Sequence, residues 1–242
     1  MPETENEEKE QKIFVRFYKG FRKKRFAYLA TSILLLLLAY PYLEHNLTGK
    51  LLMTVITIMV MISLVVAASD ERHSSIFVAL GLAVPWFVTL LTDSIPHFEP
   101  EHSVLVSKEI AFAALLFLYT TFRIFMHLLR SREITSEILF AAVCVYLLIG
   151  LSWASIYIFL EVMKPGSFLD TAGSMINNPP RFLFFSYVTL TTVGYGTLTP
   201  ATDQARSICM IEAIVGQLYV TIMVARLVGL HISRPRVTDG GI

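Results

Sequence analysis

The residues of this chain whose types and spacing best fit a chemical role are Thr-Val-Gly-Tyr-Gly at 192–196. Backbone carbonyl oxygens can replace the water shell of a monovalent cation when they are fixed in place and converge on one axis. To aim successive carbonyls inward, the chain must leave ordinary helix and strand geometry. Gly194 and Gly196 tolerate the positive φ that such a run requires, and Thr192 adds a hydroxyl oxygen at one end. The segment therefore predicts a cation site built from main-chain oxygens.

The run and its flanks resemble the selectivity filter of the potassium channel family. The similarity extends back through residues 183–191, which resemble a pore helix, and forward into an apolar helix that contains Gly216. It is specific from about residue 138 to residue 231. The resemblance implies that K⁺ is the permeant ion, that no cofactor is needed, and that the ion ligands are the carbonyls of Thr192, Val193, Gly194 and Tyr195.

The composition is typical of an integral membrane protein. Hydrophobic residues make up 55% and charged residues 16% of the 242 residues, and the mean hydropathy is +0.61, which excludes a soluble fold. A net charge of +1 predicts no nucleic-acid partner. Cys144 and Cys209 lie in apolar runs, where packing as small hydrophobic residues is favoured over a disulfide. Polar residues within the apolar runs are too few and scattered for a catalytic site, so we expect no enzyme.

Several apolar runs have the length of a membrane-spanning helix, about 20 residues. They lie near residues 26–43, 51–69, 75–92, 108–129, 137–162 and 204–231. Residues 163–203 contain the filter motif and are too polar at their start to span, so they must enter and leave on one side. The resemblance implies an all-α integral membrane protein with six transmembrane helices, a re-entrant pore helix and a homotetrameric pore. For the first four helices the similarity rests on helix count alone.

The same reading divides the chain into four parts. They are a cytoplasmic tail with a basic juxtamembrane segment (1–25), a four-helix peripheral, sensor-like membrane domain (26–130), a pore domain (131–231) and a short cytoplasmic tail (232–242). Most Lys and Arg residues are cytoplasmic when both termini are inside, as the positive-inside rule favours for a multi-pass protein of the cell membrane. Bases alternate with aromatic residues over 12–25, so this segment either contacts anionic lipid or is a plain positive-inside anchor.

A short pore helix is expected ahead of the filter. Asn178 is a suitable N-cap, Pro179 and Pro180 suit the first turn, and the helix should end near Thr191. The C-terminal end of this helix would face the central cavity. The partial negative charge of the helix dipole there favours a waiting cation.

Two positions depart from the family pattern. Most relatives carry Asp directly after the filter and Trp in the pore helix, and the two side chains can hydrogen-bond to brace the outer mouth. Here Thr197 occupies the first place, and Phe184 and Phe185 occupy the aromatic places. Phenylalanine has no donor and threonine has no charge. The brace is therefore absent in its usual form, which leaves filter stability and strict selectivity open.

Glu212 is an acidic residue inside an apolar run. A buried carboxylate must be paired or protonated. Glu212 either braces the back of the pore helix through Ser186, Thr189 or a filter amide, or faces a watery crevice without a specific role. Bracing is favoured because ionisable residues within membranes are functional by default. The predicted filter support comprises Glu212, Ser186, Thr189 and Thr197.

Gly216 lies one turn after Glu212. It either bends the last helix as a gating hinge, which the resemblance implies, or allows close helix packing. If the helix faces the pore as in relatives, the ion path is lined at helical spacing by Gln217, Val220, Val224 and Val228. Apart from Gln217 these side chains are apolar. A narrow apolar stretch of this kind could close the ion path by excluding water.

The fourth apolar run is where a voltage sensor would be expected. Arg123, His127 and Arg130 cluster near its end, while residues 111–122 carry no charge, which favours positive-inside anchoring over voltage sensing. We therefore expect a K⁺-selective channel that conducts passively and is not steeply voltage-gated. Two alternatives stay open, namely a less selective monovalent cation channel and a non-conducting modulatory or scaffold subunit.

Overall fold

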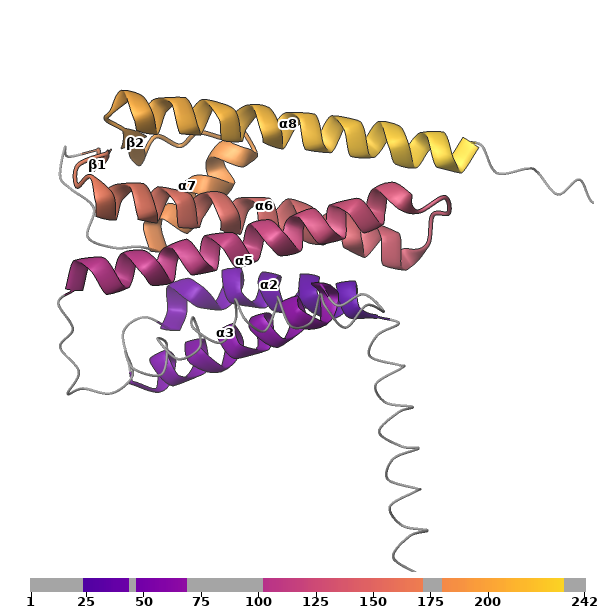
Figure 1. Cartoon of the computed structure of the whole chain (residues 1–242), viewed down its shortest axis with the longest axis horizontal. Helices are drawn as coiled ribbons and strands as arrows, with labels where there is room; N and C mark the ends of the chain where they lie inside the picture. The colour runs from indigo at the N-terminus through magenta and orange to yellow at the C-terminus, as the bar shows by residue number, and fades with distance from the viewer. Residues whose placement is uncertain (1–23, 44–46, 69–101, 172–179, 233–242) are drawn as a thin grey trace, which may run out of the picture.

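The computed structural model describes residues 24–43, 47–68, 102–171 and 180–232, and this part of the chain is mostly helical (Figure 1). The predicted spanning helix at 75–92 lies outside the described residues. So do the acidic N-terminal tail, most of the basic segment that follows it, and the C-terminal tail.

The helices of the described part follow the predicted apolar runs to within a few residues. They are α2 (Arg25–Leu43), α3 (Leu47–Ala68), α5 (His102–Arg130), α6 (Ser136–Met163), α7 (Pro180–Leu190) and α8 (Asp203–Ile232). Three of these described helices contain stretches long and apolar enough to cross a membrane, namely Ile110–Arg130, Ser136–Met163 and Asp203–Ile232. By length and composition, these helices point to a membrane protein.

Two short strands correct the all-α expectation in one detail. β1 (Phe168–Asp170) and β2 (Leu198–Pro200) pair antiparallel, with Leu169 opposite Thr199 at the centre of the ladder. Strands of three residues are too short for an alternating pattern to be read from the sequence. The pair brings together the segment that follows α6 and the segment that follows the filter motif.

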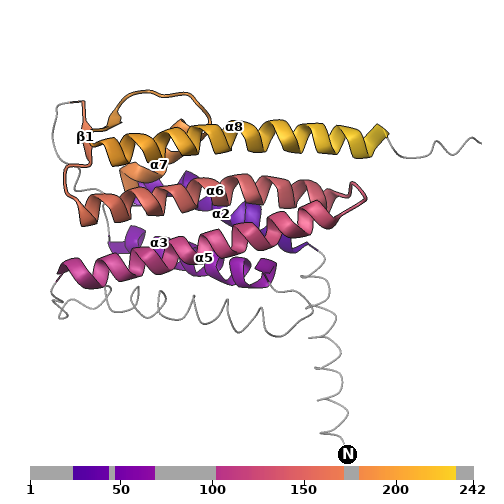
Figure 2. The same ribbon diagram turned by 45° about the horizontal axis from the view of Figure 1, so that its top comes forward.

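α2 and α5 pack against α6 of the same chain, and α3 packs against α2 and α5. α5 and α6 lie side by side along most of their length, and α2 contacts both α3 and α6 (Figures 1 and 2). Their common core is apolar and includes the fully buried side chains of Leu29, Leu64, Leu128 and Leu148, one from each helix. α2, α3, α5 and α6 therefore share one hydrophobic core.

The connection between α5 and α6 is short and well capped. It comprises residues 131–135, and the Oγ1 of Thr135 accepts a hydrogen bond from the Ile138 N–H at 3.3 Å, which caps the start of α6. Arg226 of α8 reaches the same place. Its Nη2 donates to the carbonyl oxygens of Leu129 and Ser131, each at 2.8 Å. The C-terminal part of α8 is thus attached, through Arg226, to the turn between α5 and α6.

Both cysteines are free thiols in apolar surroundings. Cys144 is fully buried, and its Sγ donates to the carbonyl oxygen of Phe26 at 3.0 Å. Cys209 is half-buried. Cys144 therefore packs α6 against α2, as expected for a small hydrophobic residue.

The short helix α7 packs closely against α6 at Gly150. Ser186 Oγ lies 2.8 Å from the Gly150 carbonyl oxygen, and the Tyr187 hydroxyl donates to the Leu147 carbonyl oxygen at 2.7 Å. A Cβ added at Gly150 would lie 2.5 Å from Cε1 of the Tyr187 ring. Because the hydroxyl of Tyr187 is held, the ring cannot easily move aside, and only glycine allows this approach.

We expect Gly150→Ala to lower the thermal unfolding midpoint of the purified protein in detergent, since overpacking of this kind costs about 1–3 kcal/mol. The matched control is Gly229→Ala, because a Cβ added at Gly229 meets nothing within 4 Å. Both changes replace a helical glycine and gain the same helix propensity. Equal midpoints for the two variants would contradict the assigned packing.

Candidate functional site

The filter motif leaves helical geometry directly after α7. Thr192, Gly194 and Gly196 have φ of 59°, 60° and 74°, whereas Val193 and Tyr195 between them do not have positive φ. A main chain that alternates in this way turns successive peptide groups to the same side, so that like groups converge. The motif therefore forms a row of peptide groups with a common orientation.

Main-chain hydrogen bonds fix which side of that row faces α7. The Thr192 N–H donates to the Thr189 carbonyl oxygen at 2.9 Å, and the Val193 N–H donates to the Val188 carbonyl oxygen at 2.9 Å. The Gly194 N–H points to the same Val188 oxygen at 3.4 Å. In a planar trans peptide the carbonyl points opposite to the N–H. The carbonyls of the same peptide groups therefore point away from α7, which is the arrangement that a main-chain cation site needs.

The left-handed conformation of Thr192 was missed by sequence reasoning, which assigned positive φ only to the glycines. A positive φ in a β-branched residue is rare and strained, and such strain persists where the surrounding structure imposes it, often at functional sites. The signal was available in the spacing. Thr192 precedes Gly194 by the two residues that separate Gly194 from Gly196.

The aromatic residues of the motif region have two different neighbours. Phe184 stacks in parallel on Tyr195, with ring centroids 5.9 Å apart and an interplanar angle of 3°. Phe185 instead packs behind α7, against Tyr157 and Phe168 at 5.3 Å and 5.6 Å. The two adjacent phenylalanines therefore pack in different places, and of the two it is Phe184 that contacts the filter motif.

Glu212 joins three helices behind the motif. Its side chain is fully buried, which does not fit a watery crevice. Its Oε1 accepts from the Ser186 hydroxyl of α7 at 2.5 Å, and its Oε2 accepts from the Tyr157 hydroxyl of α6. Of the predicted partners, Ser186 contacts Glu212, whereas Thr189 contributes its carbonyl to the Thr192 amide. Tyr157 was not predicted, because its contact spans 55 positions of sequence.

Gly216 lies against the end of α7. A Cβ added at Gly216 would lie 2.5 Å from the Leu190 carbonyl oxygen and 2.8 Å from Leu190 Cδ1. α8 continues without interruption through this position. The geometry therefore gives Gly216 the role of close packing, and a hinge at the same residue stays a prediction.

The residues predicted to line the ion path lie on exposed parts of α8. Gln217 is exposed, and its Nε2 lies 3.4 Å from the Thr192 Oγ1 at the start of the motif. Val220, Val224 and Val228 are 43%, 54% and 51% exposed in the single chain. Gln217 therefore connects the predicted pore wall with the filter motif.

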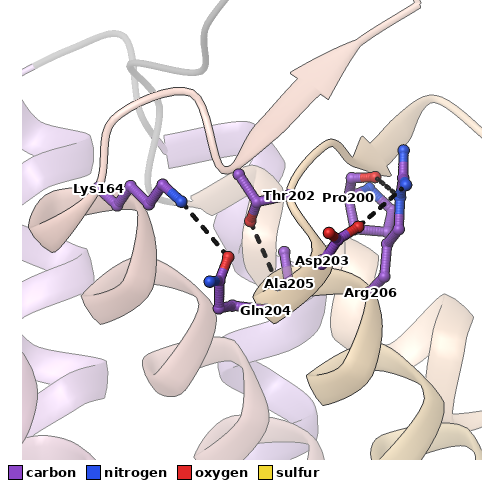
Figure 3. Close-up of polar contacts among 7 residues, drawn as sticks. All are labelled: Lys164, Pro200, Thr202, Asp203, Gln204, Ala205 and Arg206. Atoms are coloured by element: carbon purple, nitrogen blue, oxygen red, sulfur yellow. Dashed lines mark hydrogen bonds and ion pairs between the residues drawn. The ribbon is translucent and has the colours of Figure 1, made fainter.

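The segment after the motif leads into α8, and the start of α8 contacts the end of α6. Thr197 is followed by β2, and Thr202 Oγ1 then accepts from the Ala205 N–H at 3.3 Å, capping the start of α8 (Figure 3). Lys164 Nζ lies 3.4 Å from Gln204 Oε1, and this contact links the end of α6 to α8 (Figure 3). The Lys164–Gln204 contact is exposed and contributes little to stability, whereas the Thr202 cap is part-buried.

Side-chain ligands for a resident metal are not gathered in the described part of the chain. No group of three or more His, Cys, Asp or Glu residues lies together there in a way that could hold a metal ion. The oxygens available at the candidate site belong to the main chain and to Thr192. Such neutral oxygens suit a monovalent cation that passes through.

We expect Glu212→Ala to lower the thermal unfolding midpoint in detergent, because it leaves the buried Tyr157 hydroxyl without its acceptor, at a cost of about 1–3 kcal/mol. The Ser186 hydroxyl keeps an alternative acceptor in this variant, because its Oγ also lies 2.8 Å from the Gly150 carbonyl oxygen. Glu212→Gln keeps one acceptor and one donor and should fall between Glu212→Ala and wild type. The control is Glu133→Ala, at an exposed carboxylate. An unchanged midpoint for Glu212→Ala would contradict the bracing contact.

The comparison with known protein families agrees with this geometry. Residues 133–231 match the model of a family described as ion channel. No match was found among curated proteins or among solved structures. The matched residues run from the turn before α6 almost to the end of α8, so they include α7, the filter motif and the Glu212 contacts. This part of the chain therefore carries an ion channel domain.

Proposed function

We propose that the protein is a potassium-selective channel that conducts K⁺ passively through main-chain carbonyls of Thr192, Val193, Gly194 and Tyr195. The observation that carries the proposal is the alternation of left-handed positions together with amides tied back to α7. This combination supports a row of carbonyls facing away from the helix, where they can replace the hydration shell of an ion. The permeant ion is the substrate of the site, and no cofactor is proposed.

A homotetramer follows from what one chain can supply. One run of carbonyls lies on one side of an ion, and a closed ring requires further copies around the axis. Large apolar side chains near the motif are exposed in the single chain, among them Phe184 at 52%, Val193 at 53% and Tyr195 at 68%. Exposed apolar patches of this kind mark association surfaces. Four copies would cover them and would place Gln217 and the three valines of α8 along the ion path.

The proposed setting is the cell membrane, with several spans and both termini cytoplasmic. The Lys and Arg distribution supports this orientation, and the basic N-terminal segment would then face anionic lipid headgroups. The less selective cation channel remains the second candidate, and the specific observation in its favour is Thr197 in place of an acidic residue. A non-conducting subunit would differ from both channel candidates because liposomes that contain only this protein would show no cation flux.

The selectivity prediction uses liposomes that contain only this protein. We expect K⁺ flux to exceed Na⁺ flux for wild type, and Gly194→Ala to abolish selective flux, because a methyl group disfavours the positive φ at that position. Gly229→Ala should conduct as wild type. Native mass of the same sample should correspond to four chains. Undiminished selectivity of Gly194→Ala would rule out the assigned filter, and absence of wild-type flux would favour the non-conducting subunit.

The proposed channel is not steeply voltage-gated, because α5 lacks mobile charge. Moving one elementary charge through the field yields about 2.3 kcal/mol per 100 mV, and steep gating needs roughly three to four charges per subunit. Arg123 and Arg130 both lie in the last third of α5, and residues 110–122 carry no charged side chain. Even a full crossing by Arg123 would supply about one charge per subunit.

We therefore expect steady-state conductance to vary gently from strongly negative to strongly positive potentials, aside from ion block. Planar bilayer recordings of the purified channel in symmetrical K⁺ measure this directly. Arg123→Gln should change the slope of the conductance–voltage relation by at most the contribution of about one charge per subunit. A steep sigmoid equivalent to about ten or more gating charges per tetramer would show that α5 acts as a true sensor.

A further inference from the structure

The end of the filter motif continues directly into a paired strand. Thr197 is the single residue between Gly196 and Leu198, which begins β2. β2 pairs with β1 over three residues, and the Ala201 N–H extends the ladder by donating to the Ser167 carbonyl oxygen at 2.8 Å. β1 and β2 together are the outer strand pair. The position of the last filter residue therefore depends on where this pair is held.

Glu161 attaches the outer strand pair to the end of α6. Its Oε1 accepts from the Gly166 N–H at 2.7 Å, and its Oε2 accepts from the Phe168 N–H at 2.9 Å. Glu161 is only 8% exposed. One donor, Gly166, belongs to the turn that leads into β1, and the other, Phe168, is the first residue of β1. Hydrogen bonds from main-chain amides to a carboxylate are roughly twice as strong as neutral ones. Two of them on one side chain fix the start of β1.

The side chain of Phe168 fixes the same strand from behind. It is fully buried, and its ring lies 5.3 Å from Tyr157 of α6 and 5.2 Å from Phe182 of α7, measured between centroids. These distances are those of favourable aromatic pairs. Leu198 of β2 is buried in the same apolar cluster. Both strands are thus anchored to the helices that surround the filter motif.

We propose that the outer strand pair is the brace of the filter in this chain and that Glu161 is the residue that positions it. The proposal rests on the proposed function, because it gives a supporting role beside a conducting filter. The usual side-chain brace lacks its partners, since Thr197 carries no charge and Phe184 and Phe185 carry no donor. Main-chain pairing needs neither group, because β1 holds β2 through peptide groups.

The proposal predicts a specific defect when the anchor is removed. A filter that is held less firmly leaves its conducting form more often, and bound K⁺ opposes this loss because it binds only the conducting form. Weakening the brace should therefore speed the decay of K⁺ current, and raising outer K⁺ should slow that decay. A loss of general stability would instead reduce the yield of assembled protein without this K⁺ dependence.

The first experiment compares Glu161→Gln and Glu161→Ala with wild type in reconstituted bilayers at low and high outer K⁺. Gln offers one acceptor oxygen and Ala offers none, so we expect decay to become about tenfold faster for each hydrogen bond lost. High outer K⁺ should slow the decay in both variants. The control is Lys164→Gln, in the same turn but exposed, with its side chain directed to Gln204 (Figure 3).

The second experiment strengthens the brace without touching Glu161. Leu169 and Thr199 lie directly opposite in the ladder, and opposite residues of antiparallel strands come close enough for a disulfide after a small adjustment. The double variant Leu169→Cys with Thr199→Cys should show slower decay when oxidised and wild-type decay after reduction. The two single variants control for Cys144 and Cys209. Because one sample is measured in both states, the result does not depend on how well Glu161 variants fold.

The outcomes separate this proposal from the function on which it rests. Absence of selective K⁺ flux in wild type would remove the proposed function itself. If wild type conducts selectively but Glu161→Ala decays as wild type does, Glu161 does not position the filter. If oxidation of the cysteine pair leaves the decay unchanged, the outer strand pair is not the brace. Faster decay in the first experiment and slower decay in the second support it.

Discussion

The structure depends on holding a short run of main chain in a conformation that it would not adopt alone. Thr192 has φ of 59°, and a non-glycine residue held in a sparsely populated region costs about 1–3 kcal/mol. The amides of this run satisfy the last carbonyls of α7, so the end of the helix and the start of the strained run stabilise each other. The rest of the chain must keep α7 in place for this arrangement to persist.

Two other helices, α6 and α8, hold α7. The Tyr187 ring packs against Gly150 of α6, and its hydroxyl donates to the Leu147 carbonyl oxygen. The Leu190 carbonyl oxygen packs against Gly216 of α8, so glycine at both places allows a close approach. Glu212 then joins α6, α7 and α8 through two hydroxyl groups. Removing one member of such a buried cluster lowers stability by more than one hydrogen bond contributes. The reason is that the remaining polar groups stay buried without water and without a partner.

The sequence predicted the features that local pattern controls. Apolar runs gave the helices to within a few residues, and the Thr-Val-Gly-Tyr-Gly spacing identified the site region that the ion channel family match includes. Contacts between distant segments were not predictable in this way. Tyr157 and Glu161 look like ordinary residues near the end of an apolar helix, and β1 and β2 are three residues each. Their roles follow from tertiary neighbours that no period of the sequence reveals.

The contact at Gly216 also constrains how the last helix can move. The Leu190 carbonyl oxygen would lie 2.5 Å from a Cβ added at Gly216, and Leu190 is the last residue of α7. A bend of α8 at Gly216 therefore displaces the surface on which the end of α7 lies. Because the Thr192 and Val193 amides are bound to carbonyls of α7, movement of that end moves the first filter residues. Packed interiors have low compressibility and transmit such strain. If α8 bends at Gly216, that bend is therefore coupled to the conformation of residues 192–196, and Gln217, which reaches Thr192 Oγ1 from the next position of α8, adds a second connection between them.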